Sequence, residues 1–477
     1  MKDLFKTEDG WALWIGLFVF ILSLGTIAGI DLLGWGAATN VWLDVAKSVT
    51  PVSKGYATLP GIVALGLTYG FMLVIMSIGA ARLNLDAKKF AIGFSIIFWI
   101  SYVSWLVGNY AYVAATPDKL PAFKIPWSLG LTGEAGFIIA LLAGLIVGNF
   151  FPRFATYLKE ATRPEWYIKT AIVILGASLG VQAASATGLA TAILFRGLAA
   201  IVEAYLIYWA LVYFVARKFF KFSREWAAPL ASGISICGVS AAIATGAAIR
   251  ARPVVSIMVS SLVVIFAVVE LLILPFAAQT FLSSQPMVAG AWMGLAVKTD
   301  GAAVASGAIT DALIRAKVFA DTGVQYKEGW MLLTTTTVKV FIDVFIGIWA
   351  FVLALVWVYA IDKKPGERVR VIEIWQRFPK FIIGYFVTFL ILLWLAIARP
   401  DWVNPLKVAT AESNVFRVLF FVLTFFSIGL VSNFRKLREE GIGKLTLVYV
   451  VSLFGFIIWI GLVISFVFFN GITPPSG

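Results

Sequence analysis

Charged side chains interrupt several long apolar stretches of this sequence, and a charge at that position is costly unless it is paired or performs chemistry. Lys298 and Asp300 lie in a segment rich in glycine, alanine and serine, and Asp300 is the expected compensating charge for Lys298. Lys339 and Asp343 are four residues apart in an apolar run, so one helix face holds both within pairing distance. Glu270 lies deep in another run. The lysines suit an anion, and the carboxylates suit a coupling proton, a Na⁺ ion or a structural ion pair.

Small and hydroxyl-bearing residues accompany these charges. Glycines let the backbone approach a ligand closely, and the free N–H groups at the start of a half-helix favour an anion. The expected substrate-binding residues are Gly233, Ser235, Cys237, Gly238, Ser240, Gly294, Lys298, Thr299 and Lys339. The expected coupling or ion-pairing residues are Asp300, Asp343 and Glu270.

Two segments, 226–249 and 287–309, resemble each other. Gly233–Gly246 can be superposed on Gly294–Gly307 with both glycines and three alanines in register. This pattern predicts an internal repeat that supplies two broken or re-entrant helices meeting at the membrane midplane, as in many secondary transporters. The alternative is coincidence among small residues on helix-packing faces.

The composition places the chain in a membrane and excludes several kinds of chemistry. Of 477 residues, 61% are hydrophobic and 13% are charged, against about 25% in soluble domains. Histidine is absent, which excludes His-based metal sites and Ser-His or Cys-His catalysis, and no nucleotide-binding motif occurs. The single cysteine excludes an internal disulfide. Gly176–Gly180 matches a nucleophile-elbow pattern, but without histidine it indicates close helix packing. We therefore expect neither an enzyme nor a resident cofactor.

Apolar segments long enough to cross a bilayer recur along the chain. Because backbone polar groups in lipid must be satisfied within the segment, all of them are expected to be helices. The predicted fold is an all-α polytopic membrane protein with about 11 to 13 membrane segments. They are placed at 11–30, 61–81, 90–113, 131–151, 167–187, 189–215, 226–249, 253–277, 287–309, 330–360, 381–397, 415–431 and 445–470.

Loop charges predict the orientation. With the N-terminus in the cytoplasm, the Lys/Arg-rich loops at 82–89, 152–166, 216–225, 362–380 and 432–444 are cytoplasmic as well, and the C-terminus lies outside. The net charge of +13 is explained by these loops rather than by nucleic-acid binding.

The two glycine-rich segments leave one alternative open. If 226–249 spans the membrane, Arg250 and Arg252 emerge outside. If both segments are re-entrant, these arginines stay inside and the two elements enter from opposite faces, which is the reading we favour.

The residues around these segments resemble the YeiH-type sulfate exporter family. Ser232–Gly238 stands where that family has a glycine-serine-rich element, Gly294–Gly307 is similar to a second element, Ser427–Gly441 is similar to the family's C-terminal stretch, and Leu145–Gly180 is similar to its opening region. The resemblance covers about 131–470. It implies a secondary active transporter in a cell membrane, an inner membrane in bacteria, that exports sulfate, a related sulfur oxyanion or an organic anion by alternating access.

Two departures from that family change the expectation. Lys298-Thr299 replaces the family's His-Glu pair, so proton coupling through that histidine cannot operate, and H⁺ or Na⁺ coupling must use other groups. Residues 1–130 add about three helices, expected to be a scaffold or dimerisation unit of a homodimer. A passive anion channel is the alternative function.

Overall fold

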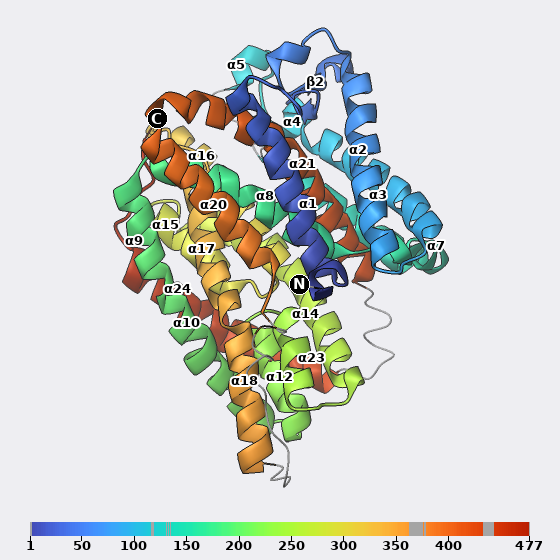
Figure 1. Cartoon of the computed structure of the whole chain (residues 1–477). Helices are drawn as coiled ribbons and strands as arrows, with labels where there is room; N and C mark the ends of the chain where they lie inside the picture. The colour runs from blue at the N-terminus through green and yellow to red at the C-terminus, as the bar shows by residue number, and fades with distance from the viewer. Residues whose placement is uncertain are drawn as a thin grey trace. The chain divides into compact units, whose positions relative to one another are not determined.

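The chain folds almost entirely into helices (Figure 1). The computed structural model describes residues 2–115, 119–129, 131, 133, 135–361, 375, 378–432 and 443–476. Within these residues, ten helices are long and apolar enough to cross a membrane. The prediction of an all-α polytopic membrane protein is confirmed. Much of the two basic loops at 362–380 and 432–444, including Arg368, lies outside the described residues.

The chain divides into two compact units, each built from several stretches of sequence. Unit 1 comprises 1–190, 315–325 and 380–431, and unit 2 comprises 191–314, 326–379 and 432–477. The predicted N-terminal segment 1–130 lies in unit 1 together with parts of the predicted core 131–470. The division at residue 130 stays a prediction.

The long helices of unit 1 are α1 (Glu8–Ser23), α2 (Gly61–Arg82), α3 (Ala87–Gly108), α6 (Ala135–Phe150), α8 (Pro164–Ala184), α20 (Phe381–Ala398) and α21 (Val403–Val431). Its short elements are α4 (Ala111–Ala114), α5 (Leu120–Phe123), α7 (Pro152–Tyr157) and the strands β1 (Ala37–Thr39) and β2 (Val49–Pro51). The strands pair antiparallel, with Ala37 opposite Pro51. This small sheet lies in the connection between α1 and α2, which the all-helical reading of the sequence did not foresee.

Helix α8 is the centre of unit 1 and packs against α1, α20 and α21. A Cβ on Gly176 would lie 2.5 Å from the carbonyl oxygen of Tyr385, and one on Gly180 would lie 2.3 Å from that of Phe389. Only glycine allows α8 and α20 to approach so closely. The prediction that Gly176–Gly180 serves helix packing is confirmed.

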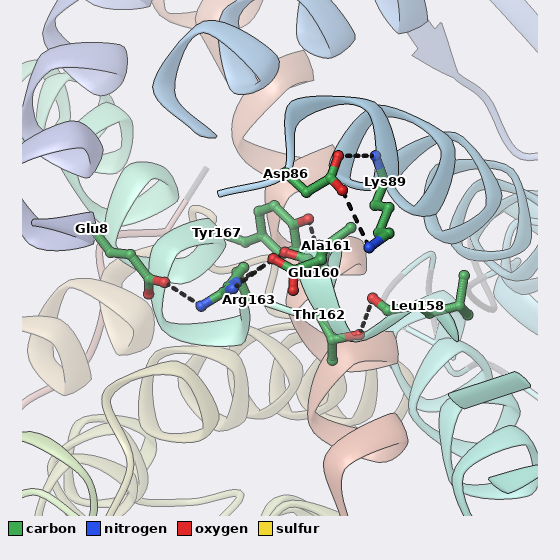
Figure 2. Close-up of polar contacts among 9 residues, drawn as sticks. All are labelled: Glu8, Asp86, Lys89, Leu158, Glu160, Ala161, Thr162, Arg163 and Tyr167. Carbon is green, nitrogen blue, oxygen red and sulfur yellow. Dashed lines mark hydrogen bonds and ion pairs between the residues drawn. The ribbon is translucent and has the colours of Figure 1, made fainter. Parts of the chain in front are cut away.

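Three segments predicted to be cytoplasmic meet at one end of unit 1 (Figure 2). Arg163, in the loop 152–166, bonds to Glu8 beside the N-terminus over 2.9 Å and pairs with Glu160 at 3.6 Å. Asp86 in the loop 82–89 accepts the backbone N–H of Lys89 at 3.0 Å, which caps α3 and lowers the pKa of Asp86. This common end agrees with one common side for these segments. Which side is cytoplasmic stays a prediction.

Unit 2 contains the two glycine-rich segments. Its helices are α9 (Thr187–Gly197), α10 (Ala199–Val202), the π-helical turn η7 (Glu203–Tyr208), α11 (Trp209–Lys218), α12 (Arg224–Ser235), α13 (Ser240–Ala248), α14 (Pro253–Phe281), α15 (Pro286–Ala296), α16 (Asp300–Thr322), α17 (Trp330–Val344), α18 (Ile346–Val356), α23 (Gly443–Ser452) and α24 (Ile458–Phe469). Two of these helices are shared between the units: α9 begins in unit 1, and α16 ends in it.

The first glycine-rich segment is a hairpin of α12 and α13, interrupted at 236–239. Its two ends lie together, because Glu225 at the start of α12 accepts hydrogen bonds from the backbone N–H and the guanidinium of Arg252, at 2.8 and 3.0 Å. Thr245 on α13 also donates to Ser232 on α12, at 2.7 Å. The chain therefore enters and leaves on one side, as the re-entrant alternative predicts.

The second glycine-rich segment is interrupted at 297–299, between α15 and α16. Along α15, Gly290 lies against Met331 and Gly294 against Thr335, where an added Cβ would meet carbonyl oxygens at 2.7 and 2.8 Å. The residue numbers of these contacts increase in the same direction along both helices, so α15 and α17 are parallel.

Helix α16 returns along α17 in the opposite direction. Asp300, at its start, lies beside Lys339, and Asp311, about 16 Å further along the helix, accepts the backbone N–H of Met331 at 3.0 Å. Helices α15 and α16 therefore form a second hairpin, and its break falls at the position that corresponds to the first break in the predicted repeat. This coincidence supports the repeat.

The two hairpins enter from opposite ends of α14. Arg252 is the residue directly before α14, and α15 begins at Pro286, after a short turn that follows the end of α14 at Phe281. With 29 residues and about 1.5 Å per residue, α14 is long enough to cross the hydrocarbon layer. At its far end, Gln285 accepts a hydrogen bond from the backbone of Gly471, so the second hairpin opens beside the C-terminal residues.

Candidate functional site

The tips of the two hairpins touch. The backbone N–H of Gly238, in the first break, donates to the carbonyl oxygen of Lys298, in the second, at 2.7 Å. A Cβ on Gly238 would lie 2.3 Å from Val263 and 3.2 Å from Thr299, so a side chain there would push the tips apart. The glycine at this position makes the junction possible.

Lys339 reaches into the junction from α17. Its ammonium donates to the carbonyl oxygen of Ile236 at 2.6 Å, which uses a backbone group that the first break leaves free. It also pairs with Asp300 at 3.6 Å and with Asp343 at 3.8 Å. All three charged residues are about 1% exposed. The predicted Lys339–Asp343 pair is confirmed, and Asp300 completes a buried triad.

A thiol lies beside the triad. Cys237, Asp300 and Asp343 each offer one ligand atom, and these three atoms lie within 4.8 Å of one another. Two carboxylate oxygens and a sulfur at this spacing can hold a cation, and the ammonium of Lys339 already occupies that role in part. The group therefore favours a proton or a cation, in exchange with Lys339, over direct contact with an anion.

Lys298 has different surroundings from those the sequence predicts. Its ammonium donates to the carbonyl oxygen of Leu295 and lies over the ring of Tyr208, 4.4 Å from the ring centre. Among the described residues, the ion pair of Asp300 is with Lys339, so the expected Lys298–Asp300 pair is wrong. The reason is local, because side chains two positions apart across the start of a helix do not face each other.

Glu270 anchors the second hairpin rather than standing ready for a ligand. One oxygen accepts the backbone N–H of Lys298 at 3.0 Å, and the other accepts the hydroxyl of Tyr449 at 2.7 Å. Glu270 thereby ties the tip of the hairpin to α14 and α23. Both of its carboxyl oxygens are satisfied as acceptors.

Of the remaining predicted residues, some pack tightly or cap a helix, and others have polar side chains beside the junction. Gly233 and Gly294 lie in tight helix contacts, where a Cβ would meet Val259 and the Thr335 carbonyl, both at 2.8 Å. Thr299 accepts the N–H of Ala302 at 3.2 Å and so caps α16.

Two serines differ from these. The hydroxyl of Ser235 is buried and has no hydrogen-bond partner within the described part of the chain. Ser240 is the first residue of α13 and is half-buried. Both keep hydroxyl groups available beside the junction.

The sequence analysis did not predict three residues that the structure places in the site. Tyr208 and Tyr449 read as ordinary aromatic residues of apolar segments, and only their contacts with Lys298 and Glu270 distinguish them. Glu203 is fully buried in η7, close enough to Lys298 for electrostatic interaction. Its charge inside an apolar run was the available signal.

The charges of the whole site change the expected chemistry. Two ammonium groups, from Lys298 and Lys339, are accompanied by four carboxyl groups, from Glu203, Glu270, Asp300 and Asp343. With every group ionised the site is negative, so an anion binds favourably only after protons or cations neutralise some of the carboxylates.

Comparisons with known proteins agree with a membrane protein. The profile of a family described as "Conserved hypothetical protein 698" matches residues 128–448. A UPF0324 membrane protein of Nitrosomonas europaea is 43% identical over 474 residues, covering 98% of this chain and 97% of the relative. One of Rhodopirellula baltica is 29% identical, covering 78% of this chain and 62% of the relative. One of Streptococcus agalactiae is 24% identical, covering 78% and 94%. No solved structure matches.

Proposed function

This chain belongs to the UPF0324 family of membrane proteins, and we propose that it is a secondary active transporter of a small anion. Sulfate, a related sulfur oxyanion or an organic anion is the candidate substrate, and export is the candidate direction. The resemblance to YeiH-type exporters supports this substrate class.

One observation carries the proposal. Two broken hairpins enter unit 2 from opposite ends of α14, and their tips meet at Gly238 and Lys298 among buried charges. Interrupted helices that meet near the midplane are the usual way in which secondary transporters expose backbone dipoles and fixed charges to a substrate. Ions buried at this cost in stability are expected to serve transport.

The charged residues of the site restrict how the transport cycle can work. The anion-facing cation is Lys298, because the ammonium of Lys339 is already paired with two carboxylates. The four carboxyl groups favour transport of the anion together with H⁺ or Na⁺. The burial of the site favours alternating access over a permanently open channel.

Further proposals concern the whole protein. The N-terminus lies in the cytoplasm and the C-terminus outside, and the chain works in the cell membrane as a homodimer with residues 1–130 as scaffold. An impermeant thiol reagent that labels an introduced cysteine beside the C-terminus in intact cells, and not one in the loop 82–89, supports this orientation. The reverse labelling contradicts it.

Counterflow in proteoliposomes tests the function. Labelled sulfate and thiosulfate are offered outside vesicles loaded with the unlabelled anion, with and without pH and Na⁺ gradients. Saturable exchange that a gradient accelerates supports a coupled transporter. Ohmic anion current that ignores both gradients would establish the channel instead, and absence of flux for every anion would remove this substrate class.

A further inference from the structure

Glu203 is a buried carboxyl group of unit 2. It is fully buried, and neither of its oxygens has a hydrogen-bond partner within the described part of the chain. It begins η7, the π-helical turn inside the long apolar helix 187–218. A π-helical turn shifts the helical register and often marks a functional position.

Its polar neighbours are few. The hydroxyl of Tyr208 lies near Glu203 but donates its hydrogen bond to the carbonyl oxygen of Ile457, at 2.8 Å. Gly461 packs closely against both groups, since a Cβ there would lie 2.7 Å from the Tyr208 hydroxyl and 3.5 Å from a Glu203 oxygen. The Tyr208 hydroxyl is thus near enough to interact with the carboxyl group, although its hydrogen bond goes to Ile457.

The charged groups that face Glu203 can be named for each element packed against η7. Helices α10 and α24 contain no titratable residue, α12 carries its charges in its first turn, and α11 carries basic residues only in its last turn. Helix α17, whose Ile342 carbonyl oxygen accepts a hydrogen bond from Tyr205 of η7, carries Lys339 and Asp343, which pair with each other. The groups that interact with Glu203 are Tyr208 on its own turn and Lys298 at the tip of the second hairpin.

Lys298 is the complementary group. Its ammonium is held by one carbonyl oxygen and one ring, and it has no carboxylate within ion-pair distance among the described residues. An ionised carboxylate is strongly disfavoured at this depth unless it is compensated, whereas a neutral acid is tolerated far better. An ammonium that turns from Leu295 toward Glu203 would compensate the ionised form.

We infer that Glu203 carries a proton in the transport cycle and that Lys298 is the counter-charge of its ionised form. In the observed state the acid holds the proton. When the site opens to water, the O–H bond breaks, the proton leaves to water, and the carboxylate pairs with the Lys298 ammonium. This inference rests on the proposed transport function and names H⁺ as the coupling ion, with a carboxyl group outside the triad around Lys339.

The first arm of the test needs no substrate. Infrared difference spectra of the purified protein, recorded on pH steps, show the carbonyl stretch of protonated carboxyl groups that titrate. We expect a band that Glu203→Gln abolishes and that Glu203→Asp retains at a shifted frequency. Glu412→Gln is the matched control, because Glu412 in unit 1 is also a buried carboxyl group within an apolar helix. An unchanged band in folded Glu203→Gln overturns the inference.

The second arm uses sulfate uptake in proteoliposomes. Glu203→Gln should lower uptake driven by a pH gradient to the level without a gradient, while sulfate counterflow at equal pH persists. Uptake that a pH gradient still drives in Glu203→Gln overturns the coupling role. If the infrared band behaves as expected but the wild-type protein moves no sulfate or thiosulfate, the proton site stands and the proposed anion transport fails. Glu203→Asp, which keeps an acid, distinguishes lost protonation from misfolding.

Discussion

The two buried lysines of unit 2 lie on either side of one hairpin junction and have opposite surroundings. Lys339 is held by two carboxylates and a backbone carbonyl, whereas Lys298 is held by a carbonyl and the face of a tyrosine ring. Both side chains are about 1% exposed. Burial alone therefore does not reveal the role of a lysine.

The partners indicate how each charge works. Moving the Lys339 ammonium away would leave the charges of Asp300 and Asp343 uncompensated, so Lys339 stabilises the folded site. Moving Lys298 breaks one hydrogen bond and one cation–π contact, so its charge can follow a ligand or Glu203. The following experiments test this contrast.

The largest effect is expected for Lys339→Met. It leaves two buried carboxylates without a cation and should reduce the free energy of unfolding by about 3–5 kcal/mol. Denaturant unfolding in detergent measures the loss. The triple variant with Asp300→Asn and Asp343→Asn should recover most of it, because removing all the charges leaves none uncompensated. Wild-type stability in Lys339→Met alone would contradict the structural role.

The junction that brings the two lysines together should be sensitive to one methyl group. Gly238→Ala forces a Cβ against Val263 and should destabilise the protein by about 1–3 kcal/mol. Gly66→Ala in α2 is the matched control, since a Cβ there meets nothing within 4 Å. The control should stabilise its helix by roughly 0.5–1 kcal/mol. Equal effects of both substitutions would exclude a tight junction.

Lys298→Met should separate stability from transport. The change in unfolding free energy should stay within about 1 kcal/mol, because a well-packed apolar side chain replaces a charge that has no carboxylate partner. Sulfate counterflow should be lost, and Lys298→Arg should keep part of it.

The double variant Lys298→Met with Asp300→Asn sharpens this result. It should not restore transport, since Asp300 pairs with Lys339 and not with Lys298. Restored transport would show that the two residues do compensate each other, as their proximity in the sequence suggested. Full counterflow in Lys298→Met alone would remove this lysine from substrate binding.

The smallest effect is expected at the open end of the first hairpin. Arg252 lowers the pKa of Glu225 through its hydrogen bonds, so the pair contributes stability above the unfolded pKa of Glu225 and loses it as pH falls through the folded value. Both side chains are partly exposed, so Arg252→Ala should lower the free energy of unfolding only slightly. A double-mutant cycle with Glu225→Gln, at low and high salt, measures the coupling. A large coupling that high salt leaves unchanged would contradict a surface pair.

Several features of the site were predictable because they depend on short-range periodicity and composition. The spacing of Lys339 and Asp343 places them on one helix face in any context. Clusters of glycine in 226–249 and 287–309 indicated broken helices, and the breaks occur in the predicted register. The charge of Arg252 favoured a hairpin, which its pair with Glu225 supports.

Other features depended on which helices lie together. Asp300 faces Lys339 because α16 returns along α17, and no local pattern specifies that return. Tyr449 meets Glu270 across 179 residues, and Glu203 meets Lys298 only because the second hairpin ends beside η7.

Hydropathy and helical spacing are local properties, so they are enough to predict a helical membrane protein with two broken segments and charges buried in the membrane. The partners of those charges, by contrast, depend on how the helices pack together. In a low-dielectric interior, the partner determines whether a charge is neutralised in place or left to respond to a ligand, and that partner comes from another part of the chain.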